Sequence, residues 1–396
     1  MRILVHDYSG HPFQVELSRE LSVRGHEVIH SYCEGYTSGK GRLRAEPGET
    51  LTFDPIGVGV VIAKTSFGRR LVQELRLGFE LARQARRIRP GVVIVSNAPI
   101  PTLVVLAAAL RARGVPWVLW HQDVQAVAVR SFAGTKLSRA FALVATVIGA
   151  GEKWCARQAA AVVVIADAFL DIHRRWGTVD KTTVIPNWAP LSEIQPVTRS
   201  NDWSHEHGLE GVKTLLYSGT LGLKHDPGLL VGLARHVIDG GQPVQLVVVN
   251  EGPAVPVLRD EAARHGVPLT LLPFQPYERL SEVLGSGDVL VVLLERTAGA
   301  FSVPSKTLSY LCAGRPILGL MPAENLAATL VTLAEGRVLP PERDALPAAA
   351  AWVCGVLADP ELSLTMGKAA RALAEREFAL TRSADAFEAI LTSSVQ

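Results

Sequence analysis

Short apolar runs alternate with amphipathic segments along most of the chain. Between the runs, apolar residues recur at helical spacing, as they do over 12–25 and 69–90. Strands that are apolar on both faces predict parallel sheets with helices on each side. The sequence therefore predicts an α/β protein. The principal strand-like runs are 2–8, 26–32, 91–98, 116–122, 160–167, 182–187, 212–219, 243–252, 267–274, 288–295 and 315–321.

The alternation is interrupted over 186–211, which is polar, rich in Pro, Ser and Asn, and without periodicity. It then restarts with the same order of runs. We therefore expect two tandem doubly wound, Rossmann-like domains facing across a deep cleft. The predicted boundaries are 1–188 for the first domain, 189–211 for a linker and 212–377 for the second domain, with a C-terminal helix at about 378–396 that packs back on the first. A length of 396 residues suits two domains of ordinary size.

Charge is distributed unevenly. Residues 1–187 hold 24 Lys and Arg against 15 Asp and Glu, a balance of +9, and the remainder holds 16 against 23, a balance of −7. A basic half indicates an anionic partner, although an uneven split can also arise without one. The N-terminus has no long apolar segment of the signal-peptide type, and no apolar run reaches the ~18 residues of a spanning helix. The four cysteines are far apart and are expected to be reduced thiols.

Three strand ends carry candidate chemistry: "HDYSGHPF" (6–13), "YSGTLGLKHD" (217–226) and "ERTAGAFSVPSK" (295–306). Ligands of such sheets bind at the carboxyl ends of the strands. Glycines allow a backbone to approach a ligand closely, and a helix N-terminus offers free N–H groups to an anion. Together with Lys224 and Lys306, these features suit a diphosphate.

Several familiar sites are absent from the sequence. It contains no G-x-x-x-x-G-K-[ST] and no G-x-G-x-x-G after the first strand, which argues against a P-loop ATPase and an ordinary NAD enzyme. It also contains no D-x-D pair, no H-E-x-x-H and no Cys/His ligand spacing. We therefore expect neither a metal nor a cofactor, and lysines and backbone amides would hold the diphosphate alone.

Four segments resemble the retaining glycosyltransferases of family 4, which have the GT-B fold. The most specific is "VPSKTLSYLCAGRPIL" (303–318); the others are "VIPNWAP" (184–190), "YSGTLGLKHDPGLLVGLA" (217–234) and "VVVNEGP" (247–253). The resemblance covers nearly the whole chain, and the nearest subgroup builds O-antigen, capsule or exopolysaccharide.

The resemblance implies a role for each candidate residue. Lys224 would stabilise the leaving UDP, and His121 and Asp123 would orient the acceptor hydroxyl, although a lone His at a strand end is often only a satisfied hydrogen bonder. His6 and Asp7 are weaker candidates near the same crevice, and Lys306 could instead be a surface lysine. The donor-binding set is Gly10, Gly219, Thr220, Asn250, Glu251, Phe274, Ser302, Val303, Pro304, Ser305, Lys306, Thr307 and Ser309.

The chain departs from its relatives at one motif. Many of them carry E-x7-E, whose second Glu grips the donor ribose. The corresponding positions here are Phe301 and Ser309, and Glu295 is out of register. The departure indicates either an altered donor grip, with Ser309 bonding a hydroxyl, or lost activity.

The resemblance implies a metal-independent, retaining hexosyl- or N-acetylhexosaminyltransferase. It would move a sugar from a UDP-linked donor, such as an N-acetylated deoxyhexosamine, to a lipid-diphosphate-linked glycan. Two alternatives remain open, a sugar-nucleotide epimerase of the same fold and a non-catalytic scaffold. The expected location is cytoplasmic and peripheral, on the inner face of the plasma membrane. Basic residues over 64–89, with Phe67, Leu71, Leu75, Phe79 and Leu81 at helical spacing, predict an amphipathic helix for an anionic membrane, unless its apolar face packs on the sheet.

Overall fold

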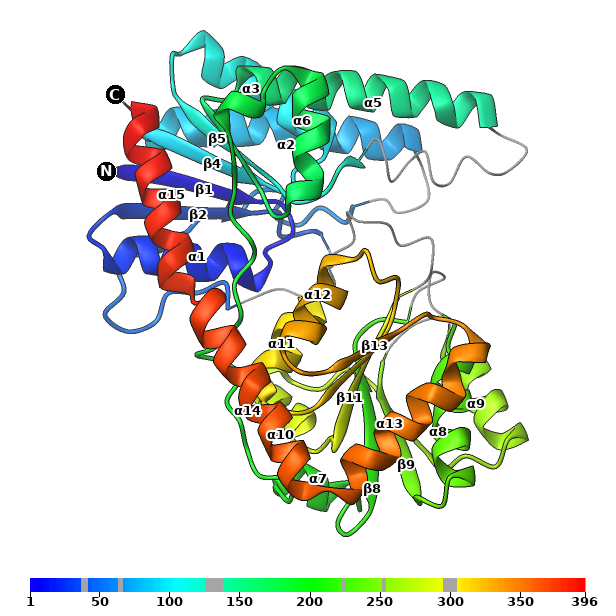
Figure 1. Cartoon of the computed structure of the whole chain (residues 1–396). Coiled ribbons are helices and arrows are strands. Elements are labelled where there is room, and N and C mark those ends of the chain that lie inside the picture. The colour runs from blue at the N-terminus through cyan, green and yellow to red at the C-terminus, as the bar shows by residue number, and fades with distance from the viewer. Residues whose placement is uncertain are drawn as a thin grey trace. The chain divides into compact units, whose positions relative to one another are not determined.

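The structure, a computed structural model, describes residues 1–36, 42–62, 67–125, 138–221, 226–250, 254–294 and 305–395. The chain forms two compact units (Figure 1). Unit 1 comprises Met1–Asn187 together with Leu380–Gln396, and unit 2 comprises Trp188–Ala379. The chain thus leaves unit 1 once and returns to it with its last helix.

Unit 1 is built on a seven-stranded sheet in the order β3-β2-β1-β4-β5-β6-β7, with every neighbouring pair parallel. The order reverses between β1 and β4, which is where a ligand crevice is expected. Strands β4 and β5 are buried along their whole length, as strands covered on both faces must be. The strands are β1 Arg2–Asp7, β2 Glu27–Tyr32, β3 Thr52–Phe53, β4 Val92–Ser96, β5 Trp117–His121, β6 Ala161–Val164 and β7 Thr182–Val184.

Helices α2, α3 and α5 pack side by side in unit 1, whereas α1 packs with the C-terminal helix α15 (Figure 1). The predicted helix over about 378–396 is α15, and its Phe387 ring lies 4.8 Å from the ring of Trp120 in β5. Arg24, at the end of α1, forms an ion pair of 2.9 Å with Glu388 of α15. The helices are α1 Pro12–Val23, α2 Phe67–Ile88, α3 Ile100–Ala112, α5 Ser138–Gln158, α6 Leu170–Trp176 and α15 Leu380–Val395.

Unit 2 has a six-stranded parallel sheet in the order β10-β9-β8-β11-β12-β13, and its order reverses between β8 and β11. Successive residues of β8 point into different cores, because side chains alternate along a strand. Leu216 belongs to one apolar cluster, and Leu215 and Tyr217 belong to the other. The strands are β8 Lys213–Ser218, β9 Val244–Val249, β10 Leu269–Leu272, β11 Val289–Leu293, β12 Ile317–Leu320 and β13 Arg337–Leu339.

The helices of unit 2 supply the two apolar clusters of its core. Residues of α11, α12 and α14 line one cluster, and residues of α8, α9 and α13 line the other. They are α7 Asp202–Glu206, α8 Gly228–Asp239, α9 Val255–Arg264, α10 Leu280–Gly285, α11 Ser305–Ala313, α12 Leu326–Leu333, α13 Leu346–Ala358 and α14 Pro360–Glu377.

Within the described ranges, no single helix is long and apolar enough to cross a membrane, and one pair bent by 104°, Arg343–Ala358 with Pro360–Val395, passes on length and composition.

The predicted linker over 189–211 is built into unit 2. Its side chains Ile194 and Trp203 are fully buried in the unit 2 core, and Trp188, just before the segment, is fully buried as well. Few residues of the segment are apolar, but those few are the ones that face the core. The segment shows no periodicity because it follows the surface as a strap rather than as a long helix.

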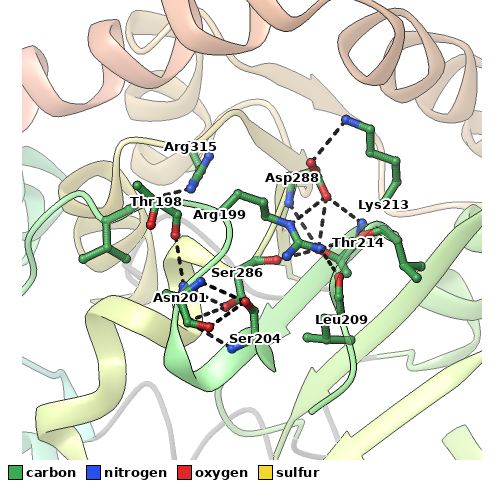
Figure 2. Close-up of polar contacts among 12 residues, drawn as sticks. Thr198, Arg199, Asn201, Ser204, Leu209, Lys213, Thr214, Ser286, Asp288 and Arg315 are labelled. Carbon is green, nitrogen blue, oxygen red and sulfur yellow. Dashed lines mark hydrogen bonds and ion pairs between the residues drawn. The ribbon is translucent and has the colours of Figure 1, made fainter. Parts of the chain in front are cut away.

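Polar contacts fasten this strap to unit 2 (Figure 2). Asp288, before β11, forms an ion pair of 3.1 Å with Arg199 and accepts a hydrogen bond of 2.8 Å from the Thr214 backbone N–H. Asn201 caps α7, where its side chain and that of Ser204 bond each other's backbone N–H in a capping box. The strap is therefore held at several points along its length.

The predicted α/β fold with two doubly wound sheets is confirmed. The sequence does not predict two short edge strands, β3 and β13. Runs of two or three residues are too short to show a period, so the sequence carries no signal for them.

Candidate functional site

The reversal point of the unit 2 sheet brings together several of the predicted donor-binding residues. Tyr217 and Ser218 end β8, Gly219 follows directly, and α11 begins at Ser305 beyond the neighbouring strand β11. Carboxyl ends of parallel strands meet at one edge of the sheet, and ligands of such sheets are expected at the point where the strand order reverses.

Lys306 lies over the aromatic ring of Tyr217. Its Nζ is 4.1 Å from the ring centroid and donates a hydrogen bond to Tyr217 Oη. Tyr217 in turn donates from Oη to the carbonyl oxygen of Thr220 at 3.1 Å. Burial lowers the pKa of Lys306 to about 7, because little water is left to solvate the ammonium. A diphosphate bound beside it would restore the charged form.

Gly219 makes the close approach of Lys306 possible. Its φ of +140° is a conformation that glycine adopts readily, and a Cβ added there would lie 3.1 Å from Lys306 Nζ. Asn250, just after β9, accepts a hydrogen bond of 2.9 Å from the Leu221 N–H and so fixes the loop after Gly219. The Asn250 side-chain amide nitrogen is buried and has no partner among the described residues, which leaves a donor for a ligand.

Helix α11 presents Lys306, Ser309 and Tyr310 on one face, because they are three and four residues apart. Tyr310 Oη accepts a hydrogen bond of 2.8 Å from the Ser218 N–H, and burial raises the Tyr310 pKa. Thr307 is fully buried, and its hydroxyl has no partner in the part of the chain that the structure describes. Ser305 is the first residue of the helix.

The remaining predicted donor-site residues are placed less closely, or not at all. Thr220 is exposed and contributes its carbonyl to Tyr217, and Phe274, two residues after β10, is 45% exposed. Lys224, Glu251, Ser302, Val303 and Pro304, together with Phe301 and Glu295, lie outside the described residues. Their assignments stay predictions.

Unit 1 has a cavity of about 460 Å³ at the carboxyl end of its sheet. The predicted residues His121 and Asp123 both line it, His121 at the end of β5 and Asp123 two residues later. Asp123 is exposed, whereas His121 is 7% exposed. The other polar lining residues are Ser9, His11, Tyr36, Asn97, Gln122, Gln125 and Glu152.

Asp7 organises the two loops at the reversal point of unit 1. Its carboxylate accepts hydrogen bonds from the backbone N–H groups of Ser9 and His11 and from the Asn97 side chain, the last at 2.9 Å. Burial raises the pKa of Asp7. Gly10 in this loop has φ +71°, which favours glycine. Asp7 thus shapes the rim of the cavity through the loops that it holds.

His6, the other weak candidate, does not line this cavity. It is fully buried with its Nδ1 3.1 Å from Ser31 Oγ, and burial lowers its pKa to about 3. Burial therefore keeps this strand-end histidine neutral, and it packs in the core of unit 1.

Several residues that the structure brings to these two sites are not predicted from the sequence. Tyr217 and Tyr310 hold Lys306 and Ser218, and Asn97 and Glu152 line the unit 1 cavity. Glu152 carries a usable signal, because it is the one acidic residue of α5 and directly follows the apolar run of that helix. Among the described residues, no group of three or more His, Cys, Asp and Glu side chains could hold a metal ion.

Residues 11–188 match the sequence profile of the glycosyl transferase 4-like domain. This match spans 178 of the 396 residues, so the chain is similar to that glycosyltransferase family over a little less than half of its length. A curated relative is WcaI of Escherichia coli K12, named as a putative colanic acid biosynthesis glycosyl transferase, which is 27% identical over 133 residues. That alignment covers 33% of this chain and 32% of WcaI, about a third of the relative's length.

Solved structures share the fold of this chain along nearly its whole length. HepE from Anabaena, solved in complex with UDP and glucose, has a TM-score of 0.72 at 15% identity, covering 99% of this chain and 100% of HepE. Sucrose-phosphate synthase from Thermosynechococcus elongatus has a TM-score of 0.71 at 16% identity, covering 99% of this chain and 98% of that one. At such identities the likeness concerns the fold.

Proposed function

We propose that this protein transfers a sugar, with retention of configuration, from a UDP-linked donor to a lipid-linked glycan during the synthesis of a surface polysaccharide. Unit 2 would bind the nucleotide-sugar donor, and the cavity of unit 1 would bind a sugar. The reaction would need no metal, and the protein would work in the cytoplasm on the inner face of the plasma membrane. WcaI's name supports the polysaccharide context, and HepE's complex supports UDP.

The observation that carries the proposal is the largely desolvated ammonium of Lys306 beside Gly219 at the reversal point of the unit 2 sheet. Its described surroundings are an aromatic ring, a glycine and backbone rather than a carboxylate. A cation placed in this way is available to an incoming anion. Stabilisation of the negative charge that develops on a leaving diphosphate often contributes more to catalysis than any other single effect. Lys224, in the loop that continues from Gly219, would supply a second cation.

Retention without a metal is the mechanism that the family resemblance implies. The leaving phosphate would help to deprotonate the acceptor hydroxyl on the same face of the sugar. Ser309, where relatives carry a glutamate, lies on the same face of α11 as Lys306 and would bond a hydroxyl of the donor. An N-acetylated deoxyhexosamine is one donor sugar consistent with the nearest subgroup.

The outer face of α2 supports membrane docking. Leu71, Leu75 and Phe79 recur every four residues and are 49%, 37% and 58% exposed. Leu81, predicted to share their stripe, is instead buried against the core, so the apolar positions divide between two faces. Arg69, Arg76 and Arg83 are exposed at spacings of seven residues and form a line beside the apolar one. The side chain of Phe67 lies outside the described residues.

An apolar line flanked by arginines suits an anionic membrane surface. Each basic residue near an anionic leaflet contributes about 1 kcal/mol. Changing Arg83, Arg86, Arg87 and Arg89 to Gln together should therefore reduce binding to anionic vesicles by more than about 100-fold. Cosedimentation with anionic and neutral vesicles measures this. A matched control of equal charge loss changes Arg113, Arg259, Arg264 and Arg376 to Gln.

The docking proposal predicts two further results in the cosedimentation assay. Binding should weaken at about 0.5 M salt, where screening is strong, and the control variant should pellet like the wild type. Equal pelleting with both vesicle types, or unchanged binding of the α2 variant, would contradict docking by this face.

The function itself is tested by incubating the protein with a panel of nucleotide sugars and a lipid-diphosphate-linked acceptor in EDTA. The expected result is acceptor-dependent release of UDP and a product with the donor's anomeric configuration. An epimerase would convert the nucleotide sugar without acceptor. A scaffold would do neither, although a donor could still raise its melting temperature by mass action.

A further inference from the structure

A line of buried polar side chains lies behind the unit 1 cavity. Glu152, His121, His173 and Thr178 are 2%, 7%, 0% and 2% exposed. His121 Nδ1 is 3.2 Å from His173 Nε2, and His173 Nδ1 is 2.9 Å from Thr178 Oγ1. On the cavity side, His121 Nε2 is 3.8 Å from Glu152 Oε1. The line joins α5, β5, α6 and the turn after α6.

The positions of the protons along this line follow from one hydroxyl. Thr178 Oγ1 donates its only proton to the His173 carbonyl oxygen, at 3.3 Å. The hydroxyl oxygen must therefore accept from His173 Nδ1–H. Burial and the neighbouring His121 and Lys181 lower the pKa of His173 to about 3, so at neutral pH this ring has one proton. Its Nε2 is then an acceptor, and His121 Nδ1–H must donate to it.

Glu152 completes the surroundings of His121. Its Oε1 accepts a hydrogen bond of 2.6 Å from the Gln125 backbone N–H, which fixes the carboxylate and the loop after β5. The titratable groups that face the two histidines are Glu152 from α5 and Lys181, whose Nζ donates to the carbonyl oxygen of Arg157 at 2.9 Å. The ring of Trp176 stacks on the imidazole of His121, with 5.8 Å between the ring centroids, and restricts its orientation.

We propose that His173 and Thr178 are positioning residues that hold His121 as its Nδ1–H tautomer, with the Nε2 lone pair available to a hydroxyl of a sugar in the unit 1 cavity. A lone pair can accept from a hydroxyl, whereas the other tautomer could only donate. Glu152 stabilises partial positive charge on His121 when that hydrogen bond forms. The hydrogen bond from a sugar to His121 rests on the proposed function, because that function places a sugar in the cavity.

The tautomer is measured on the protein alone, by ¹⁵N NMR of histidine-labelled samples at pH 7.5. A His121→Gln variant assigns the His121 signals. The wild type should show a protonated Nδ1 and an unprotonated Nε2 at His121. Thr178→Val and His173→Phe should give a mixture of tautomers. Thr178→Ser keeps the hydroxyl, and His173→Gln keeps an acceptor near the position of Nε2, so both should retain the wild-type signature.

Activity supplies the second readout. In the transfer assay, Thr178→Val and His173→Phe should lower kcat/KM for the acceptor roughly tenfold, the scale of one lost oriented hydrogen bond. The two conservative variants should stay within about threefold of wild type, on the same scale. UDP affinity should be unchanged in all four, because UDP is assigned to unit 2.

A protonated Nε2 at His121 in the wild type would overturn the positioning, whatever the reaction proves to be. A mixed tautomer in Thr178→Val with unchanged kcat/KM would overturn the use of the lone pair. If no donor and acceptor pair gives product, the proposed function fails, while the NMR measurement still decides the tautomer.

Discussion

The two units have the same parallel architecture but differ in what they bury. Unit 1 buries two histidines of its sheet: His6 of β1 and His30 of β2 are fully buried and pair with Ser31 and Ser18. The core of unit 2 consists of two apolar clusters, and its notable titratable group, Lys306, stands at the edge of the sheet. Among the described residues, the buried histidines thus lie in unit 1, whereas Lys306 of unit 2 lies at the ligand edge of its sheet.

This difference predicts opposite responses to pH. Burial lowers the pKa of His6 and His30 to about 3, so the unfolded unit 1 binds more protons below pH 6.5 and its stability falls from there towards pH 3. The raised pKa of Asp7 opposes this at the acid end. In unit 2, burial lowers the pKa of Lys306 from 10.5 to about 7. The stability of unit 2 should therefore fall as the pH falls from about 10.5 to 7, and Lys306 should cause no further change below pH 7.

The largest effect on activity is expected from removing Lys224, the second cation predicted for unit 2. Lys224→Ala should lower kcat by roughly 10²–10³, the scale of one lost electrostatic donor at a developing charge. The transfer assay measures this, with EDTA added to the wild type as a test for metal dependence. Unimpaired turnover of the variant, or strong inhibition by EDTA, would show that lysine does not carry the charge.

The second largest effect is expected on acidification, which should lower the stability of unit 1 more than that of unit 2. Between pH 7 and 4, unit 1 should lose several kcal/mol of stability and unit 2 little from this source, because several buried histidines of unit 1 must be protonated. Hydrogen exchange with mass spectrometry, corrected for intrinsic rates, compares peptides of β1–β2 with peptides of β8–β9.

A His6→Gln, His30→Gln double variant is the control for that experiment. In this variant, unit 1 should be less stable at pH 7 than in the wild type. Its stability should depend less steeply on pH, because two of the titrating groups have been removed. Equal acid sensitivity of the two units in the wild type would remove the buried histidines as the cause.

A more modest change is expected at Ser309. If its hydroxyl bonds the donor, Ser309→Ala should weaken donor affinity by about threefold to tenfold, the worth of one neutral hydrogen bond. Ser309→Cys, of similar size but a poor donor, is the matched variant and should behave like Ala. Donor binding unchanged in both would assign recognition to the backbone around α11 instead.

Much of the fold is predictable because most strands of both sheets are apolar runs separated by amphipathic helices. The failures have local causes. The strap over 189–211 anchors itself with a few residues such as Ile194 and Trp203, and by polar contacts to Asp288, which leave no period in the sequence. On α2, helical spacing predicts one apolar face, but Leu81 packs inward and Phe79 outward.

The candidate sites divide in a similar way. His121, Lys306 and Gly219 follow strands or open a helix, so motif and position indicate them from sequence alone. Glu152, His173 and Thr178 come from other elements, and only the packing of α5 and α6 against β5 brings them to His121. Their spacing in the sequence carries no sign of that meeting.

Donor binding by unit 2 is proposed to depend on a cation beside Gly219 and not on a metal. Calorimetric titration of UDP in EDTA distinguishes these two possibilities when the wild type is compared with Lys306→Met and His121→Gln. We expect binding by the wild type, affinity at least about tenfold weaker in Lys306→Met because a charge-assisted contact is lost, and unchanged affinity in His121→Gln. UDP binding that requires added Mg²⁺, or that survives Lys306→Met but is lost in His121→Gln, would contradict this assignment.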